Sequence, residues 1–246
     1  MRNDALVLCY HGVAARVEGL SVDPSSLERQ VASLLRRGYV PVRASELAAS
    51  TRGRRLAVTF DDGYQSVLES GFPVLESLEV VATVFVATDF VGVVVRQQGS
   101  LVADALSWAD LAGLAAKGWE VGSHTVSHAQ LPTLADDALL SELVDSKRLI
   151  ESELELPCTA LAYPYGLATP REEQRARDAG YLAAFTASRR YGPPDPYRWP
   201  RVGVFRSDTP LVFRAKTSRM TRLARRTPIG GLAGGVASRI RTRLEG

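Results

Sequence analysis

Residues 56–63 read Leu-Ala-Val-Thr-Phe-Asp-Asp-Gly, a short apolar run that stops at two adjacent aspartates. A run of this kind, rich in apolar and β-branched side chains and closed by a turn signal, is typical of a buried strand. Two similar runs, at residues 6–10 and 119–123, stop at the three histidines of the chain: His11, His124 and His128. This concentration of acid–base and metal-binding side chains at strand ends indicates a metal-dependent hydrolase.

Strand-like runs alternate with segments of helical periodicity along the chain. The predicted strands are Leu6–Tyr10, Leu56–Phe60, Ala82–Ala87, Trp119–Gly122, Thr159–Tyr163, Ala183–Thr186 and Arg201–Phe205. The predicted helices are Pro24–Arg37, Tyr64–Leu78, Trp108–Lys117, Asp136–Ser152 and Pro170–Ala179. Repeated strand–helix units in one domain predict an α/β fold, with a closed or nearly closed (β/α) barrel around a parallel sheet.

Composition is that of a soluble globular protein. The 246 residues are 46% hydrophobic and 23% charged, which excludes disordered and collagen-like classes and allows one sizeable core. No apolar run is long enough to span a bilayer, and the N-terminal residues do not resemble a signal peptide. Cys9 and Cys158 lie in apolar runs and are predicted to be small buried thiols in a reducing compartment. We therefore expect a cytoplasmic protein.

Charge is distributed unevenly. From Arg214 onward there are nine basic residues and one acidic residue, whereas the rest of the chain holds 21 basic and 26 acidic residues. This predicts a catalytic domain over residues 1–213 and a basic tail over residues 214–246. The tail is either solvated or in peripheral contact with anionic lipids on the cytoplasmic face of a membrane. It lacks interleaved aromatic residues, so nucleic-acid binding is not expected. The oligomeric state is not predicted.

The strand-end residues suggest a metal site, because the carboxyl ends of barrel strands open on one face. His124 and His128 are four residues apart, which predicts two imidazole ligands on one face of a first helical turn. Adjacent carboxylates point in different directions, so one of Asp61 and Asp62 is expected to be a ligand and the other a base. The alternative for these residues is a capping or turn role.

Other candidates have two interpretations each. His11 is either structural or the proton donor that a hydrolase expelling an amine requires. Arg201 either brings positive charge to the site or forms a surface salt bridge. Thr125 either lines an acyl pocket or caps a helix, and Trp199 either stacks on a sugar or packs in the core.

Three segments, in order, resemble the motifs of the NodB-like polysaccharide deacetylases (carbohydrate esterase family 4): Thr59–Gly63, Ser123–His128 and Ala162–Gly166. The resemblance extends from Val7 to about Phe205 and implies a distorted (β/α)₇ barrel that hydrolyses acyl groups on sugars. It implies that Asp61 is the general base and that the backbone N–H of Tyr165 stabilises the oxyanion. The implied metal ligands are Asp62, His124 and His128. We also expect Tyr163 and Pro164 to contact substrate.

Two departures from the family pattern are informative. Ala162 stands where many members have an arginine, and no histidine follows His128. Both features resemble the branch that acts on poly-β-1,6-N-acetylglucosamine, in which a histidine on the first strand is the acid; this favours His11. Arg201 is then the candidate for the missing positive charge.

The expected reaction is removal of an N-acetyl group from an amino sugar in a glycan or glycan precursor. Zn²⁺ is the expected ion, with Co²⁺, Ni²⁺ or Mn²⁺ as alternatives. A deformylase or deacetylase of lipid-linked or nucleotide-linked amino sugars is the alternative enzyme. A metal-free carbohydrate-binding relative is the alternative of another class.

Overall fold

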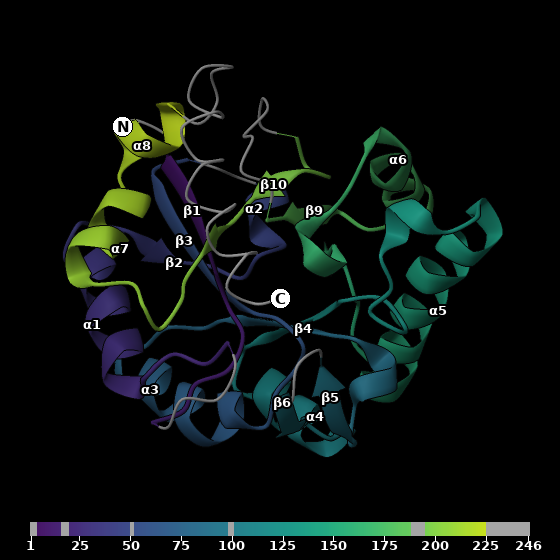
Figure 1. The fold of residues 1–246 in the computed structure, drawn as a ribbon, viewed down its shortest axis with the longest axis horizontal. Helices are drawn as coiled ribbons and strands as arrows, with labels where there is room; N and C mark the ends of the chain where they lie inside the picture. The colour runs from purple at the N-terminus through teal and green to yellow at the C-terminus, as the bar shows by residue number, and fades with distance from the viewer. Residues whose placement is uncertain (1–3, 16–19, 50–51, 98–100, 188–194, 225–246) are drawn as a thin grey trace.

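A computed structural model describes residues 4–15, 20–49, 52–97, 101–187 and 195–224. Its parallel strands form a nearly closed barrel with helices on the outside (Figure 1). The sheet runs in the order β10 (Trp199–Pro200), β9 (Ala183–Thr186), β8 (Ala160–Ala162), β7 (Glu120–Ser123), β4 (Thr83–Val86), β3 (Arg54–Phe60), β1 (Asp4–Tyr10) and β11 (Val202–Gly203). The predicted barrel is therefore confirmed.

Most of the longer helices lie between strands, and the last two follow the final strand. They are α1 (Pro24–Leu35), α3 (Phe72–Ser77), α4 (Trp108–Ala116), α5 (Asp136–Leu154), α6 (Pro170–Asp178), α7 (Pro210–Lys216) and α8 (Arg219–Ala224). Shorter elements are α2 (Glu46–Ala49), η1 (Val67–Gly71), η2 (Thr88–Phe90), η3 (Leu131–Thr133) and η4 (Pro164–Gly166). The predicted helix Tyr64–Leu78 begins late, with a π-helical turn that continues into α3.

The pairing of β10 with β9 and two other short pairings were not predicted. β2 (Val40–Pro41) pairs with β3, and β5 (Val94–Gln97) and β6 (Leu101–Asp104) form an antiparallel hairpin outside the barrel. Two-residue pairings such as β2 carry almost no periodic signal, and the hairpin strands are interrupted by polar residues. Residues 188–194, between β9 and β10, lie outside the described residues.

One continuous segment connects the two edges of the sheet. Trp199 and Pro200 pair with β9, whereas Val202 and Gly203 pair with β1. Arg201 lies between the two pairings, and its backbone N–H donates to the carbonyl of Thr186 at 3.0 Å. The closure of the barrel therefore determines where the side chain of Arg201 is placed.

Side chains alternate between the two faces of each strand, so the sheet separates one hydrophobic core outside the barrel from another inside it. Leu6, Leu8 and Val58 pack outward with the apolar face of α1 and the other helices. Val7 and Ala57 point the other way, into a narrow interior filled by small and aromatic side chains: Phe85, Ala160, Ala162, Ala183, Phe185 and Trp199. Side chains two residues apart share one face of a strand. Cys9 and Asp61 therefore lie on the inward face, at the carboxyl end of the barrel.

The beginning of the basic segment is folded. α7 spans the predicted boundary between the catalytic domain and the basic tail, at residue 213, and α8 begins after a two-residue connection. Arg222 of α8 forms an ion pair with Asp4 of β1 and donates to the carbonyl of Ala5 at 2.8 Å. Residues 214–216 and 219–224 are thus helical, and Arg222 attaches α8 to the barrel. Residues 225–246 lie outside the described residues. In the described part of the chain, no helix combines the length and apolarity needed to cross a bilayer.

Candidate functional site

The two aspartates after β3 point in different directions, as expected. Asp61 continues the inward face of the strand and is buried. Asp62 and Gly63 then adopt φ angles of 68° and 66°, which turn the chain sharply. A Cβ atom at Gly63 would lie 2.9 Å from Cγ1 of Val86, so only glycine fits this turn without displacing β4.

A cluster of metal-ligand atoms forms where β3 and β7 end. One atom from each of Asp62, His124 and His128 lies within 4.8 Å of the other two. Oδ1 of Asp62 is 3.7 Å from Nε2 of His124 and 3.5 Å from Nε2 of His128. The structure thus brings together the three residues that the sequence singled out as ligands.

The chemistry of this cluster fits a divalent cation. Oδ1 of Asp62 is buried and accepts no hydrogen bond among the described residues. Nδ1 of His124 is 2.7 Å from the carbonyl of Ala162, which leaves Nε2 as the free ring nitrogen. Burial, together with the neighbouring His124, lowers the pKa of His128 to about 4, so its imidazole is neutral at neutral pH. One carboxylate and two imidazoles with open positions are typical of catalytic zinc sites.

The histidine pair does not lie on a helical turn, which corrects the reason given for the spacing. Residues 124–130 form a loop, with φ angles of 72° at Thr125 and 60° at His128. These left-handed residues bring the two rings to a centroid distance of 4.8 Å. Non-glycine residues in this region cost about 1–3 kcal/mol each and persist only where the surroundings hold them. The loop therefore needs support from elsewhere.

Glu142 of α5 supplies that support. Its Oε2 accepts hydrogen bonds from the backbone N–H groups of Val126 and Ser127, at 2.9 and 3.0 Å, and its Oε1 accepts one from the hydroxyl of Ser127. A carboxylate with three donors from one loop holds that loop in place. The sequence contained no signal for this contact, because Glu142 is one of several charged residues on the polar face of an amphipathic helix, and such residues usually face solvent.

Glu142→Ala is expected to weaken divalent-metal affinity about 10- to 100-fold, the usual cost of removing a group that orients ligands. The reason is that the loop carrying His128 loses three hydrogen bonds. Calorimetric titration of the metal-free protein with Zn²⁺ measures the change. Glu153→Ala, on an exposed position of the same helix, is the control and should bind like the wild type. Equal Zn²⁺ affinity of the two variants would show that the loop keeps its conformation without Glu142.

Asp61 is held by a buried ion pair. Nη1 and Nη2 of Arg201 donate to its two carboxylate oxygens at 2.6 and 2.8 Å, and both side chains are nearly inaccessible. Burial alone would raise the pKa of Asp61, but the charge of Arg201 outweighs it and keeps the pKa well below its usual range. Arg201 therefore brings positive charge to the site, and the surface salt bridge considered for it is excluded.

Cys9 and His11 complete the surroundings of Asp61. Sγ of Cys9 lies 3.3 Å from Oδ2 of Asp61 and donates to it, because burial raises the pKa of the thiol. A ring nitrogen of His11 lies within 4.8 Å of a carboxylate oxygen of Asp61. These three residues also form a cluster of metal-ligand atoms. However, both oxygens of Asp61 are bound by Arg201 and the Cys9 sulfur is a protonated thiol, so the cluster is a poor metal site.

The other predicted substrate contacts separate into two groups. Tyr165 is 51% exposed, with its ring 4.7 Å from that of His128, and its φ of 57° orients the backbone at the rim. Thr125 is fully buried beside the ligands, and its hydroxyl has no partner among the described residues. No helix begins there, which excludes the capping role.

Three expected substrate contacts are instead core residues. Tyr163 is fully buried and its hydroxyl donates to the carbonyl of Tyr197 at 3.1 Å. Pro164 is also buried. Trp199 is 8% exposed and packs inside the barrel, because β10 is part of its wall. None of these three side chains presents a face on which a sugar could stack.

Comparison with known proteins places the chain among deacetylases. Residues 48–184 match the family model described as Polysaccharide deacetylase. The chain is 26% identical over 186 residues to YxkH of Bacillus subtilis (strain 168), a candidate polysaccharide deacetylase, covering 73% of this chain and 63% of that protein. It therefore spans less than two thirds of that relative.

Two further matches cover more of the related protein's length. The poly-β-1,6-N-acetyl-D-glucosamine N-deacetylase of Staphylococcus aureus (strain MSSA476) is 23% identical over 231 residues, 81% of this chain and 78% of that protein. The structure of IcaB from Ammonifex degensii superposes with a TM-score of 0.74 at 25% identity, covering 88% of this chain and 98% of that chain.

Proposed function

Because the chain belongs to the polysaccharide deacetylase family, we propose that it is a metal-dependent hydrolase that removes N-acetyl groups from an amino sugar in a glycan or glycan precursor. The observation that carries the proposal is the convergence of Asp62, His124 and His128 beside a separately held carboxylate, Asp61. A divalent cation bound by the first three residues supplies Lewis-acid polarisation of a carbonyl and lowers the pKa of a water molecule.

Asp61 is the base in this proposal. Arg201 and Cys9 direct hydrogen bonds at its oxygens, so the carboxylate is ionised and cannot rotate. In that state it accepts a proton from the water that attacks the acetyl carbon. Its low pKa makes it a weak base, which is adequate only when the pKa of the water is lowered as well. The arrangement thus requires the cation site and the base to act together.

The remaining groups serve the tetrahedral intermediate and its collapse. The backbone N–H of Tyr165, on the rim beside His128, donates to the developing oxyanion. His11, close to Asp61 and partly exposed, protonates the departing amine. The unpaired hydroxyl of Thr125 and the exposed ring of Tyr165 line the space that the acetyl group and the sugar occupy.

His11→Ala is expected to retain the metal but lower kcat on an N-acetylated glycan about 10²- to 10⁴-fold, the range for loss of a general acid. An activated ester such as p-nitrophenyl acetate, whose leaving group needs no proton, should be hydrolysed at nearly the wild-type rate. Metal content and both rates are the measurements. An equal loss on both substrates would assign His11 a structural role.

Acetate release from purified, metal-loaded protein tests the function itself. Substrates are β-1,6-linked and β-1,4-linked N-acetylglucosamine oligomers, lipid-linked and nucleotide-linked N-acetyl sugars, and their formylated forms. Mass spectrometry identifies the free amine. Release only from the lipid-linked or nucleotide-linked sugars would favour a role on precursors. Glycan binding with neither metal nor acetate release would favour a non-enzymatic relative.

A further inference from the structure

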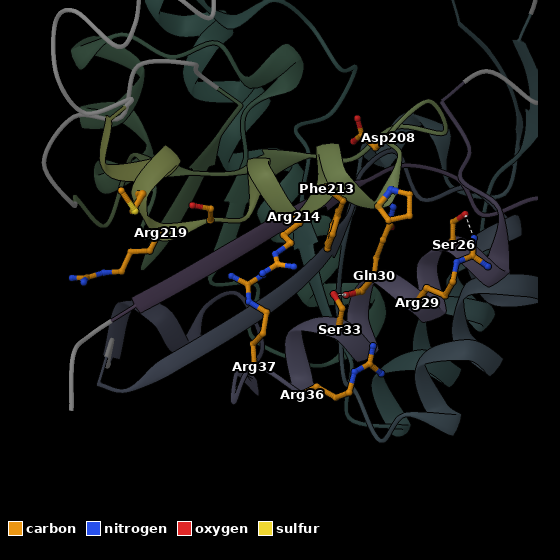
Figure 2. A pocket seen from close by; sticks show the side chains of 13 residues that line it. Ser26, Arg29, Gln30, Ser33, Arg36, Arg37, Asp208, Phe213, Arg214 and Arg219 are labelled. Atoms are coloured by element: carbon orange, nitrogen blue, oxygen red, sulfur yellow. Dashed lines mark hydrogen bonds between the residues drawn. The ribbon is translucent and has the colours of Figure 1, made fainter.

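A cleft of about 840 Å³ lies on the outside of the barrel, between α1 and the α7–α8 pair (Figure 2). Five arginines line it: Arg29, Arg36, Arg37, Arg214 and Arg219. Asp208 is the single acidic residue among the described lining residues, and its carboxylate is paired with Lys216 at 2.7 Å. The metal-ligand cluster contributes nothing to the lining, so this is a separate, strongly basic surface.

The positive charge of the cleft is not compensated within the described part of the chain. None of its five arginines forms an ion pair with a carboxylate there. Arg37 donates to the hydroxyl and carbonyl of Thr217, and Arg29 donates to serine hydroxyls, all of which are neutral groups. Figure 2 shows Arg37 and Arg214 directed toward each other from opposite walls. Like charges that converge in a concave surface favour a bound anion.

The helices that form one wall also expose apolar side chains. Leu211 of α7 is 77% exposed, Met220 of α8 is 82% exposed and Leu223 of α8 is 42% exposed. The chain continues from α8 into residues 225–246, which contain five arginines and one glutamate. Exposed apolar side chains among clustered arginines are typical of surfaces that lie on anionic membranes.

Two other anionic or glycan partners fit less well. Deacetylated glycan carries protonated amines, which five arginines would repel; this step rests on the proposed function. Nucleic acids bind basic grooves through aromatic side chains that stack on bases. Phe213, the aromatic residue of the cleft, is only 3% exposed and cannot stack.

We propose that this arginine cleft binds the phosphate groups of anionic phospholipids and holds α7 and α8 against a membrane surface. The guanidinium groups contact phosphates, and Leu211 and Met220 enter the boundary between headgroups and acyl chains. This extends the contact expected for the basic tail to a folded site that includes α1.

Co-sedimentation of the full chain with vesicles tests the proposal. Wild-type protein should bind phosphatidylglycerol-containing vesicles, weakly at high salt, and should not bind pure phosphatidylcholine vesicles. Arg36→Gln/Arg219→Gln should lower the partition coefficient about 30-fold, from the usual contribution of two basic residues near an anionic surface. Arg148→Gln/Arg177→Gln makes the same change in charge at exposed positions on α5 and α6, on the other side of the barrel, and should bind like the wild type.

Each result has a defined meaning. Equal binding of the cleft variant and the control variant would overturn the proposal, because the tail or net charge alone would then explain the attraction. Loss of vesicle binding to a competing single-stranded oligonucleotide at equal phosphate concentration would overturn it in favour of nucleic acid. Acetate release from a soluble glycan should be the same for the wild type, the cleft variant and the control variant. A failure of the membrane proposal can therefore be told apart from a failure of the proposed function. Should the double variant be unfolded by circular dichroism, Arg36→Gln alone, at an exposed position, replaces it.

Discussion

Asp62→Ala is expected to lose both the bound metal and all measurable deacetylase activity. Asp62 supplies the only anionic ligand of the cluster, and the pKa of His128 indicates that this imidazole is neutral. Without the carboxylate, a divalent cation has only two imidazole ligands in a buried site, where an uncompensated charge is costly. His124→Ala and His128→Ala should behave in the same way, because each leaves two ligands.

Metal content by elemental analysis and acetate release from an N-acetylglucosamine oligomer measure this effect. Asp61→Asn is the informative comparison: it should retain the metal while kcat falls about 10²- to 10⁴-fold through loss of the base. Asp89→Asn, at an exposed position near the histidine loop, should change neither quantity. Full turnover by a metal-free Asp62→Ala protein would refute the proposed mechanism.

Arg201→Met is expected to destabilise the fold by about 3–5 kcal/mol, the usual cost of leaving a buried charge without its partner. The ionised carboxylate of Asp61 would then keep only the Cys9 thiol as a donor. The base would also lose its orientation, so turnover should fall together with stability. Asp61→Asn/Arg201→Met should recover most of the stability, because neither charge of the pair remains, and should stay inactive.

The pH dependence of this loss has a definite sign. In the wild type, Arg201 holds the pKa of Asp61 below its ordinary value of 3.8, so the stabilisation is present above that value and is lost as the pH falls through the folded-state pKa. In Arg201→Met, the largest charge that opposes the effect of burial is gone, so the pKa of Asp61 is higher than in the wild type. The variant is then penalised most at neutral pH and less once the carboxyl is protonated.

Urea unfolding at pH 7 and pH 5, with the metal removed by a chelator in every sample, measures both effects. The difference from the wild type should be smaller at pH 5. A difference that is independent of pH would mean that Arg201 stabilises the barrel by packing between β10 and β11 rather than by its charge.

Strand placement was predictable because each barrel strand carries a run of apolar residues, and position along such a run decides which face a side chain occupies. The predicted Ala183–Thr186 matches β9, and the other six predicted strands overlap observed ones. That Asp62, His124 and His128 lie together was also predictable, because the carboxyl ends of parallel strands must meet on one face; their assignment as metal ligands came from the resemblance to the family. The stated reason for the His124–His128 spacing was nevertheless wrong: left-handed loop residues, not a helical turn, bring the rings together.

Positions near the closure of the barrel were not predictable. Trp199 and Tyr163 have the residue types of sugar-binding side chains, yet both are core residues. Their burial depends on which edges the segment at residues 199–203 pairs with, and two-residue pairings leave no periodic pattern. The contacts of Glu142 with the histidine loop and of Cys9 with Asp61 were not predicted for a related reason, since a helix surface and a strand interior give no indication of a distant partner.

The sequence by itself determined the barrel, because apolar runs and their periodicity are local patterns. The candidate metal ligands were predicted from the residues at the strand ends together with the resemblance to the family motifs. Only the tertiary structure decided that Arg201 pairs with Asp61, 140 residues earlier in the chain. It also decided that arginines from α1, α7 and α8 line one cleft. Contacts of this kind arise from the closure of the barrel and the packing of helices around it, and local sequence does not encode them.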